Sequence, residues 1–140
     1  MKKIALTLFC CLIVLTGCSS TKEKGGKVYE VTASEAVKKI EDKESFVLIV
    51  SLDTCPHCED LKEELKKNVA DQGVSFYRVE LKSEDTTTLY SDIDMLEKHL
   101  TNPSKIPHIY IIENGKEKKE SEGYDGENPD EFWNFIEENV

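Results

Sequence analysis

The chain has 140 residues, 39% of them hydrophobic, and a formal net charge of −10 at pH 7. This length and this apolar content suit a single globular domain with an adequate core. The acidic balance argues against binding to nucleic acid and against electrostatic binding to anionic lipid, because both need a basic surface. The positions of the five cysteines are more informative than their number.

Residues 1–17 have the features of a bacterial lipoprotein signal peptide. A positive start, Met1-Lys2-Lys3, precedes the apolar run Ile4–Leu15, which is too short to span a membrane. The segment Leu15-Thr16-Gly17-Cys18 resembles a lipobox, and the resemblance implies cleavage before Cys18 and lipidation of its thiol. Two acyl chains suffice for stable anchoring. We therefore expect a protein anchored by lipid to the extracytoplasmic side of the cell membrane; an ordinary signal peptide is the alternative.

Removal of the signal peptide changes the count of free thiols. Cys10 and Cys11 are discarded with it, and Cys18 is lipidated, so Cys55 and Cys58 are the remaining pair. A single C-x-x-C in an exported protein indicates that the pair is used in redox chemistry. The polar, glycine-containing residues 18–27 predict a flexible tether to the folded domain at 28–140.

The motif Cys55-Pro56-His57-Cys58 follows the apolar run 46–50, which predicts a buried strand, and precedes a helical apolar pattern over 61–69. In this setting the first cysteine lies near a helix N-terminus, whose positive end favours the thiolate. The thiolate is the nucleophile in disulfide exchange, and Cys58 can resolve the mixed disulfide. His57 can add positive charge or a hydrogen-bond donor.

Other uses of these cysteines stay open at this point. A zinc or copper site could combine Cys55 and Cys58 with His57 or His108. A third possibility is a thiol pair without redox activity on a binding module. A four-cysteine zinc site is excluded because there is no second C-x-x-C, and a structural disulfide is disfavoured because a two-residue gap closes very little loop. We expect His108 to be a partly exposed strand histidine.

Hydrophobic alternation and turn signals predict five strands. The first three alternate with helices, which implies a parallel arrangement, and Asn114-Gly115 predicts a tight hairpin between the last two. The predicted strands are 28–31, 46–51, 74–81, 108–112 and 116–121.

Helix-start signals place four helices. Thr32 and Glu35 form a capping box, and a second helix covers about 56–69. We expect 83–88 to be a loop and Ser91 or Asp92 to cap the third helix. Asn128-Pro129, with Glu at N3, starts the last helix. The side chains that we expect this helix to bury are Phe132, Phe135, Ile136 and Val140.

Over 28–140 the chain resembles the thioredoxin superfamily. The resemblance rests on Cys55-Pro56-His57-Cys58 after the central strand, Ile106-Pro107 before the next strand, the hairpin 113–116, and the turn 123–126 before the last helix. It implies an α/β thioredoxin-like fold with a central mixed sheet of four or five strands flanked by helices. It also implies that Cys55 is the exposed nucleophile, that Cys58 is the buried resolving thiol, and that Pro107 is cis. Ile106 then offers main-chain groups to an extended substrate segment.

The Pro-His dipeptide resembles that of the Dsb-type oxidases, but only 48 residues separate Cys58 from Pro107, so their inserted helical domain has no room. The chain is more similar to small thioredoxin-like surface lipoproteins, including the bacteriocin transport accessory type of Gram-positive bacteria. Thr54 replaces the family's frequent Trp, and Ile49 stands where many members carry a buried carboxylate. The acidic residues near the motif disfavour a thiolate by like charge; they are Asp53, Glu59 and Asp60.

These features predict a membrane-anchored extracytoplasmic thiol:disulfide oxidoreductase that needs no cofactor. We expect a monomer whose partners are exported proteins with thiols or disulfides and a membrane redox partner. His57 favours an oxidant; a reductase serving cytochrome or metalloprotein assembly is the competing direction. The alternatives are a metal-binding chaperone that uses Cys55, Cys58 and a histidine, and a non-catalytic accessory or immunity module.

Overall fold

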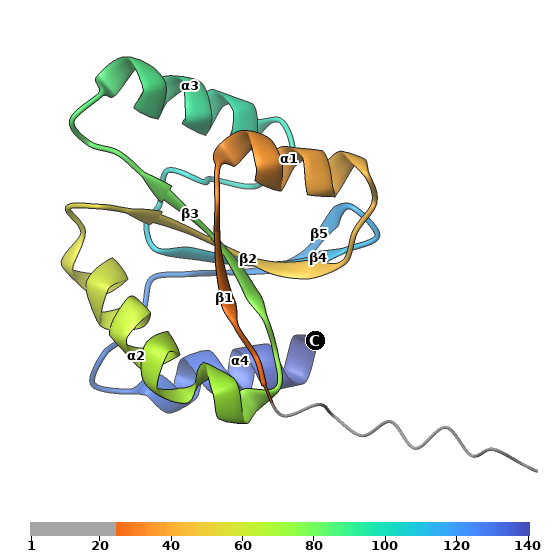
Figure 1. Ribbon diagram of the computed structural model, residues 1–140, viewed down its shortest axis with the longest axis vertical. Helices are drawn as coiled ribbons and strands as arrows, with labels where there is room; N and C mark the ends of the chain where they lie inside the picture. Colours follow the sequence, from red (N-terminus) through yellow and green to blue (C-terminus); the bar gives the residue numbers. More distant parts are fainter. Residues whose placement is uncertain (1–24) are drawn as a thin grey trace, which may run out of the picture.

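The computed structural model describes residues 25–140, which form a five-stranded sheet with two helices on each face (Figure 1). In chain order the elements are β1 (Val28–Val31), α1 (Ala33–Glu41), β2 (Phe46–Leu52), α2 (Pro56–Gln72), β3 (Phe76–Leu81), α3 (Thr86–Glu97), β4 (His108–Glu113), β5 (Lys116–Glu122) and α4 (Pro129–Asn139). The predicted signal peptide at 1–17 and the predicted lipidation site, Cys18, lie outside the described residues.

The strand order is β1-β3-β2-β4-β5. The first three strands are parallel, β4 is antiparallel to β2, and β5 is antiparallel to β4, so the predicted mixed sheet is confirmed. Asn114 and Gly115 both have positive φ, 52° and 71°, and form the predicted two-residue hairpin turn.

Alternating side chains of β2 supply two separate cores. Phe46, Leu48 and Val50 pack under α1 and α3, whereas Val47 and Ile49 pack against α2 and α4. A strand buried on both faces needs no polar alternation, which explains its continuous apolar sequence. The central strand is thereby fixed, and the residues that follow its end are held in place.

The first two helices begin and end as their local chemistry predicts. Thr32 and Glu35 form both hydrogen bonds of the capping box before α1. Helix α2 has Pro56 at its first position and ends at Gly73, which adopts the left-handed conformation with φ of 67°.

The third helix begins earlier than predicted. The segment 83–88 was expected to be a loop, but α3 begins at Thr86. Asp85 is the N-cap, and its carboxylate accepts hydrogen bonds from the backbone N–H groups of Thr87 and Thr88. The aspartate cap outweighs the weak helix propensity of three successive threonines.

The last helix begins where the sequence predicts, with Pro129 at its first position, and differs from the prediction at its C-terminal end. Asn128 is the N-cap of α4, but its side chain makes no capping hydrogen bond. Phe132 and Ile136 are buried as predicted, whereas Phe135 is half-buried and Val140 is 67% exposed. The helix ends at Asn139, so Val140 lies beyond the face that packs on the sheet.

Packing against the domain begins before β1. Gly26 is buried, and a Cβ at this position would lie 2.2 Å from the carbonyl oxygen of Val74. The carbonyl of the next residue, Lys27, accepts a hydrogen bond from the Phe76 amide at 2.8 Å. Within residues 25–140 no helix is long and apolar enough to cross a bilayer.

Candidate active site

The C-x-x-C motif lies between the end of the central strand β2 and the first turn of α2. The amide of Cys55 donates to the carbonyl of Leu52 at 3.1 Å, which closes the turn at the strand end. Cys55 is the N-cap of α2, with extended backbone angles. Its sulfur accepts a hydrogen bond from the Cys58 amide, with 3.3 Å between N and Sγ. The first sulfur therefore occupies the capping position of a helix, where backbone N–H groups face it.

The two thiols differ in environment, although they share one helical turn. Both are free cysteines; Cys55 is partly exposed, whereas Cys58 is only 4% exposed. Burial and its hydrogen bond with Cys55 raise the pKa of the Cys58 thiol to about 12. A thiol with such a pKa stays protonated at neutral pH and is a poor nucleophile until it is deprotonated. The geometry thus separates an accessible sulfur from a protected one.

The segment before β4 approaches Cys55 from the other side. The Ile106–Pro107 peptide bond is cis, as predicted. The sulfur of Cys55 lies 4.0 Å from the carbonyl oxygen of Ile106. Pro107 is buried, and its own carbonyl accepts a hydrogen bond from the Gly123 amide at 2.8 Å. Main-chain atoms of this segment are therefore beside the accessible sulfur.

His57 and Pro56 are exposed at the start of α2. His57 borders a groove of about 420 Å³ that runs toward β5 and α4. Tyr124 and Asp125 line this groove and also a second hollow on the α2 side of His57. Sequence reasoning treated these two residues only as part of a turn. The one available signal was the position of that turn, directly before the terminal helix.

The three acidic residues near the motif differ in their partners. Asp53 directs its carboxylate at the Ser83 amide, and this hydrogen bond lowers the pKa of the carboxyl group. Glu59 pairs with Lys62 at 3.3 Å along the helix. Asp60 lines the hollow beside His57. Two of the three carboxylates therefore have hydrogen-bonding or ionic partners of their own.

Ile49, which replaces the carboxylate found in many thioredoxin-like proteins, is fully buried and lies beside Arg78 on the neighbouring strand. Arg78 is 5% exposed, and its guanidinium pairs with Glu30 at 2.9 Å and with Glu80 at 3.3 Å. Its charge lowers the pKa of the Cys58 thiol, but less than burial raises it. The buried charged residue beside Ile49 is therefore an arginine and not a carboxylate.

His108 is not the partly exposed residue that we predicted. It is completely buried, stacks on Tyr110, and has ring nitrogens 2.9 Å from the Asn102 carbonyl oxygen and 2.5 Å from a Glu120 carboxylate oxygen. Tyr110 belongs to the core under α1 and α3, so this histidine is on the other face from α2. Within residues 25–140 no group of three potential metal ligands includes Cys55 or Cys58.

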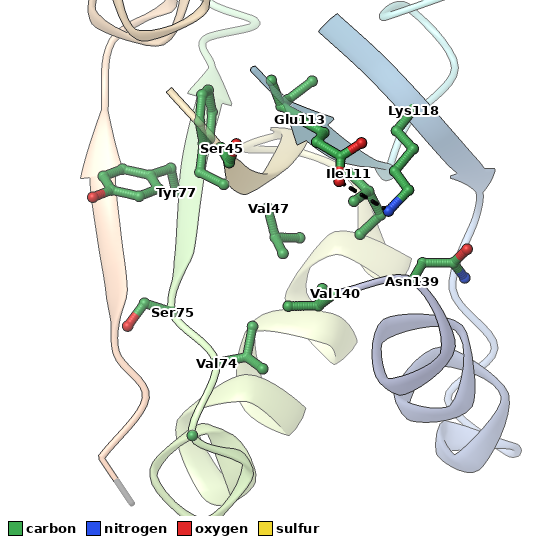
Figure 2. A pocket seen from close by; sticks show the side chains of 13 residues that line it. Ser45, Val47, Val74, Ser75, Tyr77, Ile111, Glu113, Lys118, Asn139 and Val140 are labelled. Carbon is green, nitrogen blue, oxygen red and sulfur yellow. Dashed lines mark hydrogen bonds and ion pairs between the residues drawn. The ribbon is translucent and has the colours of Figure 1, made fainter. Parts of the chain in front are cut away.

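A second groove, of about 440 Å³, lies at the opposite end of the sheet, where β2 begins and β4 ends (Figure 2). Apolar side chains such as Val47, Val74 and Val140 point into it, and the Glu113–Lys118 ion pair of 3.2 Å stands at its edge. The residues that line this groove all lie within 25–140, and none of them is a cysteine or a histidine. The chemistry is therefore concentrated at the other end of β2.

Solved structures with the same arrangement are thioredoxins. Thioredoxin f2, in a complex with ferredoxin:thioredoxin reductase, has a TM-score of 0.59 and 16% identity over 82% of this chain and 96% of its own. The chain has a thioredoxin fold. Spinach chloroplast thioredoxin f shares this fold, with a TM-score of 0.53 and 18% identity over 81% of this chain and 96% of its own.

Oxidised thioredoxin O2 from Arabidopsis thaliana also shares the thioredoxin fold. Its TM-score is 0.51, with 20% identity over 78% of this chain and 93% of that protein. No protein-family model and no curated protein matches the sequence. The likeness is therefore one of architecture, and the assignment of a function depends on the residues of the site.

Proposed function

We propose that the protein is a thiol:disulfide oxidoreductase in which Cys55 is the nucleophile and Cys58 is the resolving thiol. The observation that supports this is the asymmetry of the pair: one sulfur caps a helix and is partly exposed, and the other is buried, with its pKa raised to about 12. A substrate disulfide can reach only the first sulfur. The second meets the substrate sulfur only after a mixed disulfide has formed.

In the reducing direction, the Cys55 thiolate attacks one sulfur of a substrate disulfide. A bond forms between Cys55 and the substrate, and the other substrate sulfur leaves as a thiolate that takes up a proton. Cys58 then gives its proton to solvent and attacks the Cys55 sulfur, which releases the second substrate thiolate. Two electrons pass to the substrate, and a Cys55–Cys58 disulfide remains. The oxidising direction runs through the same steps in reverse.

The substrate segment lies along Ile106 and Pro107. The Ile106 carbonyl, 4.0 Å from the reactive sulfur, is placed to accept a hydrogen bond from an extended backbone. The groove beside His57, lined by Tyr124, receives side chains that flank the substrate cysteine. Because main-chain recognition does not depend on side chains, this arrangement fits more than one protein substrate.

The experiment that tests this function is the redox equilibrium of the Cys55–Cys58 pair with glutathione, followed by alkylation of thiols and mass spectrometry. A reduction potential of about −120 mV indicates an oxidant, and one of about −270 mV indicates a thioredoxin-like reductant. His57 within the motif favours the oxidant. A pair that never forms a disulfide, even in excess oxidised glutathione, rules out the proposed function.

The protein acts, in this proposal, on exported proteins at the extracytoplasmic side of the membrane, like small thioredoxin-like surface lipoproteins. The support is the lipobox Leu15-Thr16-Gly17-Cys18. A membrane redox partner regenerates the pair; thioredoxin f2, the neighbour described above, is in complex with a reductase.

Labelling with radioactive palmitate tests the lipid anchor. The wild-type protein should be labelled and should sediment with membranes, whereas Cys18→Ala should do neither. A labelled Cys18→Ala protein contradicts the proposed lipid anchor at this residue.

A further inference from the structure

A buried histidine and two carboxylates meet on the sheet face that carries α1 and α3. His108 lies directly opposite Glu122 in the β4–β5 register, and Glu120 is opposite Tyr110, two residues along the same face. One ligand atom from each of His108, Glu120 and Glu122 lies within 4.8 Å of the others. The proposed redox chemistry uses none of these three side chains.

The hydrogen bond at the far side of the imidazole fixes which nitrogen faces the carboxylates. Nδ1 of His108 lies 2.9 Å from the carbonyl oxygen of Asn102, and a carbonyl can only accept, so Nδ1 carries a proton. Nε2 is then directed at Glu120, 2.5 Å from its Oε2. A histidine that donates one N–H to the backbone and presents the other nitrogen is oriented as metal-ligating histidines are.

The second ring nitrogen of His108 faces the Glu120 carboxylate, and Glu122 lies opposite His108 in the β4–β5 register, so three potential ligand atoms lie close together. The histidine is fully buried, whereas the side chains of Glu120 and Glu122 are 34% and 42% exposed. A cation can therefore enter from the solvent side and meet a nitrogen ligand that is already fixed.

We propose that His108, Glu120 and Glu122 bind a divalent cation of the zinc class. One imidazole nitrogen and two carboxylate oxygens form a three-ligand set that leaves a position for water. With metal–ligand distances of about 2.0–2.2 Å, tetrahedral ligands lie roughly 3.3–3.6 Å apart. The two glutamate side chains must move to reach this geometry, and both are partly exposed to solvent. The proposal is independent of the Cys55–Cys58 chemistry.

Lys105 is the competing cation at this site. Its Nζ lies 2.8 Å and 3.1 Å from the two carboxylate oxygens of Glu122. The lysine side chain is 57% exposed, so it can swing into solvent when a metal takes its place. A variant without this charge should therefore bind the metal more tightly.

The test is a zinc titration by calorimetry on the full chain with Cys55→Ser and Cys58→Ser and with its other thiols alkylated, so that no cysteine binds the metal. We expect one zinc per chain. Glu120→Gln and Glu122→Gln should each weaken binding at least about tenfold. Lys105→Met should tighten it about two- to fivefold, because an exposed ion pair no longer competes.

Glu113→Gln is the matched control, because Glu113 is an exposed glutamate that pairs with a lysine in the same hairpin. It should bind zinc as the parent protein does. Thermal unfolding establishes that each variant is folded before its titration is compared. A parent protein that binds no zinc overturns the proposal. Equal affinities in Glu120→Gln, Glu122→Gln and Glu113→Gln also overturn it and indicate adventitious binding.

Discussion

The backbone N–H of Cys58 points at the sulfur of Cys55, with 3.3 Å between the two atoms. The same turn that gives Cys55 a donor buries Cys58, which is 4% exposed. One local structure therefore directs a hydrogen-bond donor at the first sulfur and disfavours the charged form of the second. The proposed order of the two thiols in disulfide exchange rests on this difference.

Alkylation should distinguish the two thiols directly. Iodoacetamide at neutral pH should modify Cys55 at least about tenfold faster than Cys58, because Cys58 is buried and its pKa is raised to about 12. Mass spectrometry of peptides from the reduced protein, quenched at successive times, measures both rates. The control is the same reaction in urea, where unfolding should make the alkylation rates of Cys55 and Cys58 similar. Faster modification of Cys58 in the folded protein would reverse the assigned roles.

Removal of the resolving thiol should trap the intermediate. Cys58→Ser should accumulate a mixed disulfide between Cys55 and a model substrate, because no second thiol is present to release it. Non-reducing gel electrophoresis measures the trapped species. Cys55→Ser, which keeps the buried thiol, is the matched control and should trap about a hundredfold less. Equal trapping by the two variants would show that Cys58 is itself accessible to substrate.

The stability of the reduced protein should fall at alkaline pH because of Cys58. Its pKa is about 12 in the folded state, against about 8.5 in an unfolded chain. Below about pH 8 both states hold the proton and stability is unaffected. Between about 8.5 and 12 the unfolded state releases the proton first, so the free energy of unfolding falls as pH rises. We expect a loss of about 1.6 kcal/mol between pH 8.5 and 10.

Urea unfolding of the reduced protein, followed by the fluorescence of Trp133, measures this loss. Trp133 is the only tryptophan, and it packs against Phe76 and Phe132 in the core. Cys58→Ala provides the reference, since it keeps every other titrating group. The free energy of unfolding of the wild type relative to that of Cys58→Ala should fall as the pH rises. An unchanged difference from pH 7 to 10 would mean that burial does not hold the Cys58 proton.

Local patterns predicted most of the fold because each depends on neighbours in the sequence. The continuous apolar run of β2, the capping box at Thr32 and Glu35, and the Asn114–Gly115 hairpin all form as predicted. Helix α3 was placed too late because three threonines concealed the start that Asp85 provides. In the sequence, three β-branched residues indicate a loop, although in the structure the aspartate cap outweighs them.

The candidate site was predictable only where it is continuous in sequence. The cysteine motif and Ile106-Pro107 are short patterns with a defined chemistry. The groove beside His57 instead depends on Tyr124, which comes from a distant turn. Burial of His108 depends on a cross-strand partner, Glu120, whose position is set by the register of β4 and β5. Residues brought together by tertiary structure leave no local signal.

Two glycines allow the steric and the conformational cost of a side chain to be separated. Gly115 and Gly123 both have positive φ, 71° and 80°. A Cβ at Gly115 would lie 2.2 Å from the Ile40 carbonyl oxygen and 2.8 Å from the Lys43 Cα, whereas a Cβ at Gly123 would meet no atom within 4 Å. Both substitutions to alanine have the cost of a left-handed backbone, about 1 kcal/mol. Only Gly115→Ala also forces the backbone of the α1–β2 turn to move.

We therefore expect Gly123→Ala to lower the free energy of unfolding by about 1 kcal/mol and Gly115→Ala by about 3 kcal/mol. Urea unfolding of the two variants at neutral pH, again followed by Trp133 fluorescence, gives both values. The carbonyl that blocks Gly115 belongs to the backbone, so no side-chain rotation relieves the contact. Equal losses in the two variants would mean that the hairpin turn moves away from Ile40 at little cost. The tight contact between hairpin and helix would then contribute little to stability.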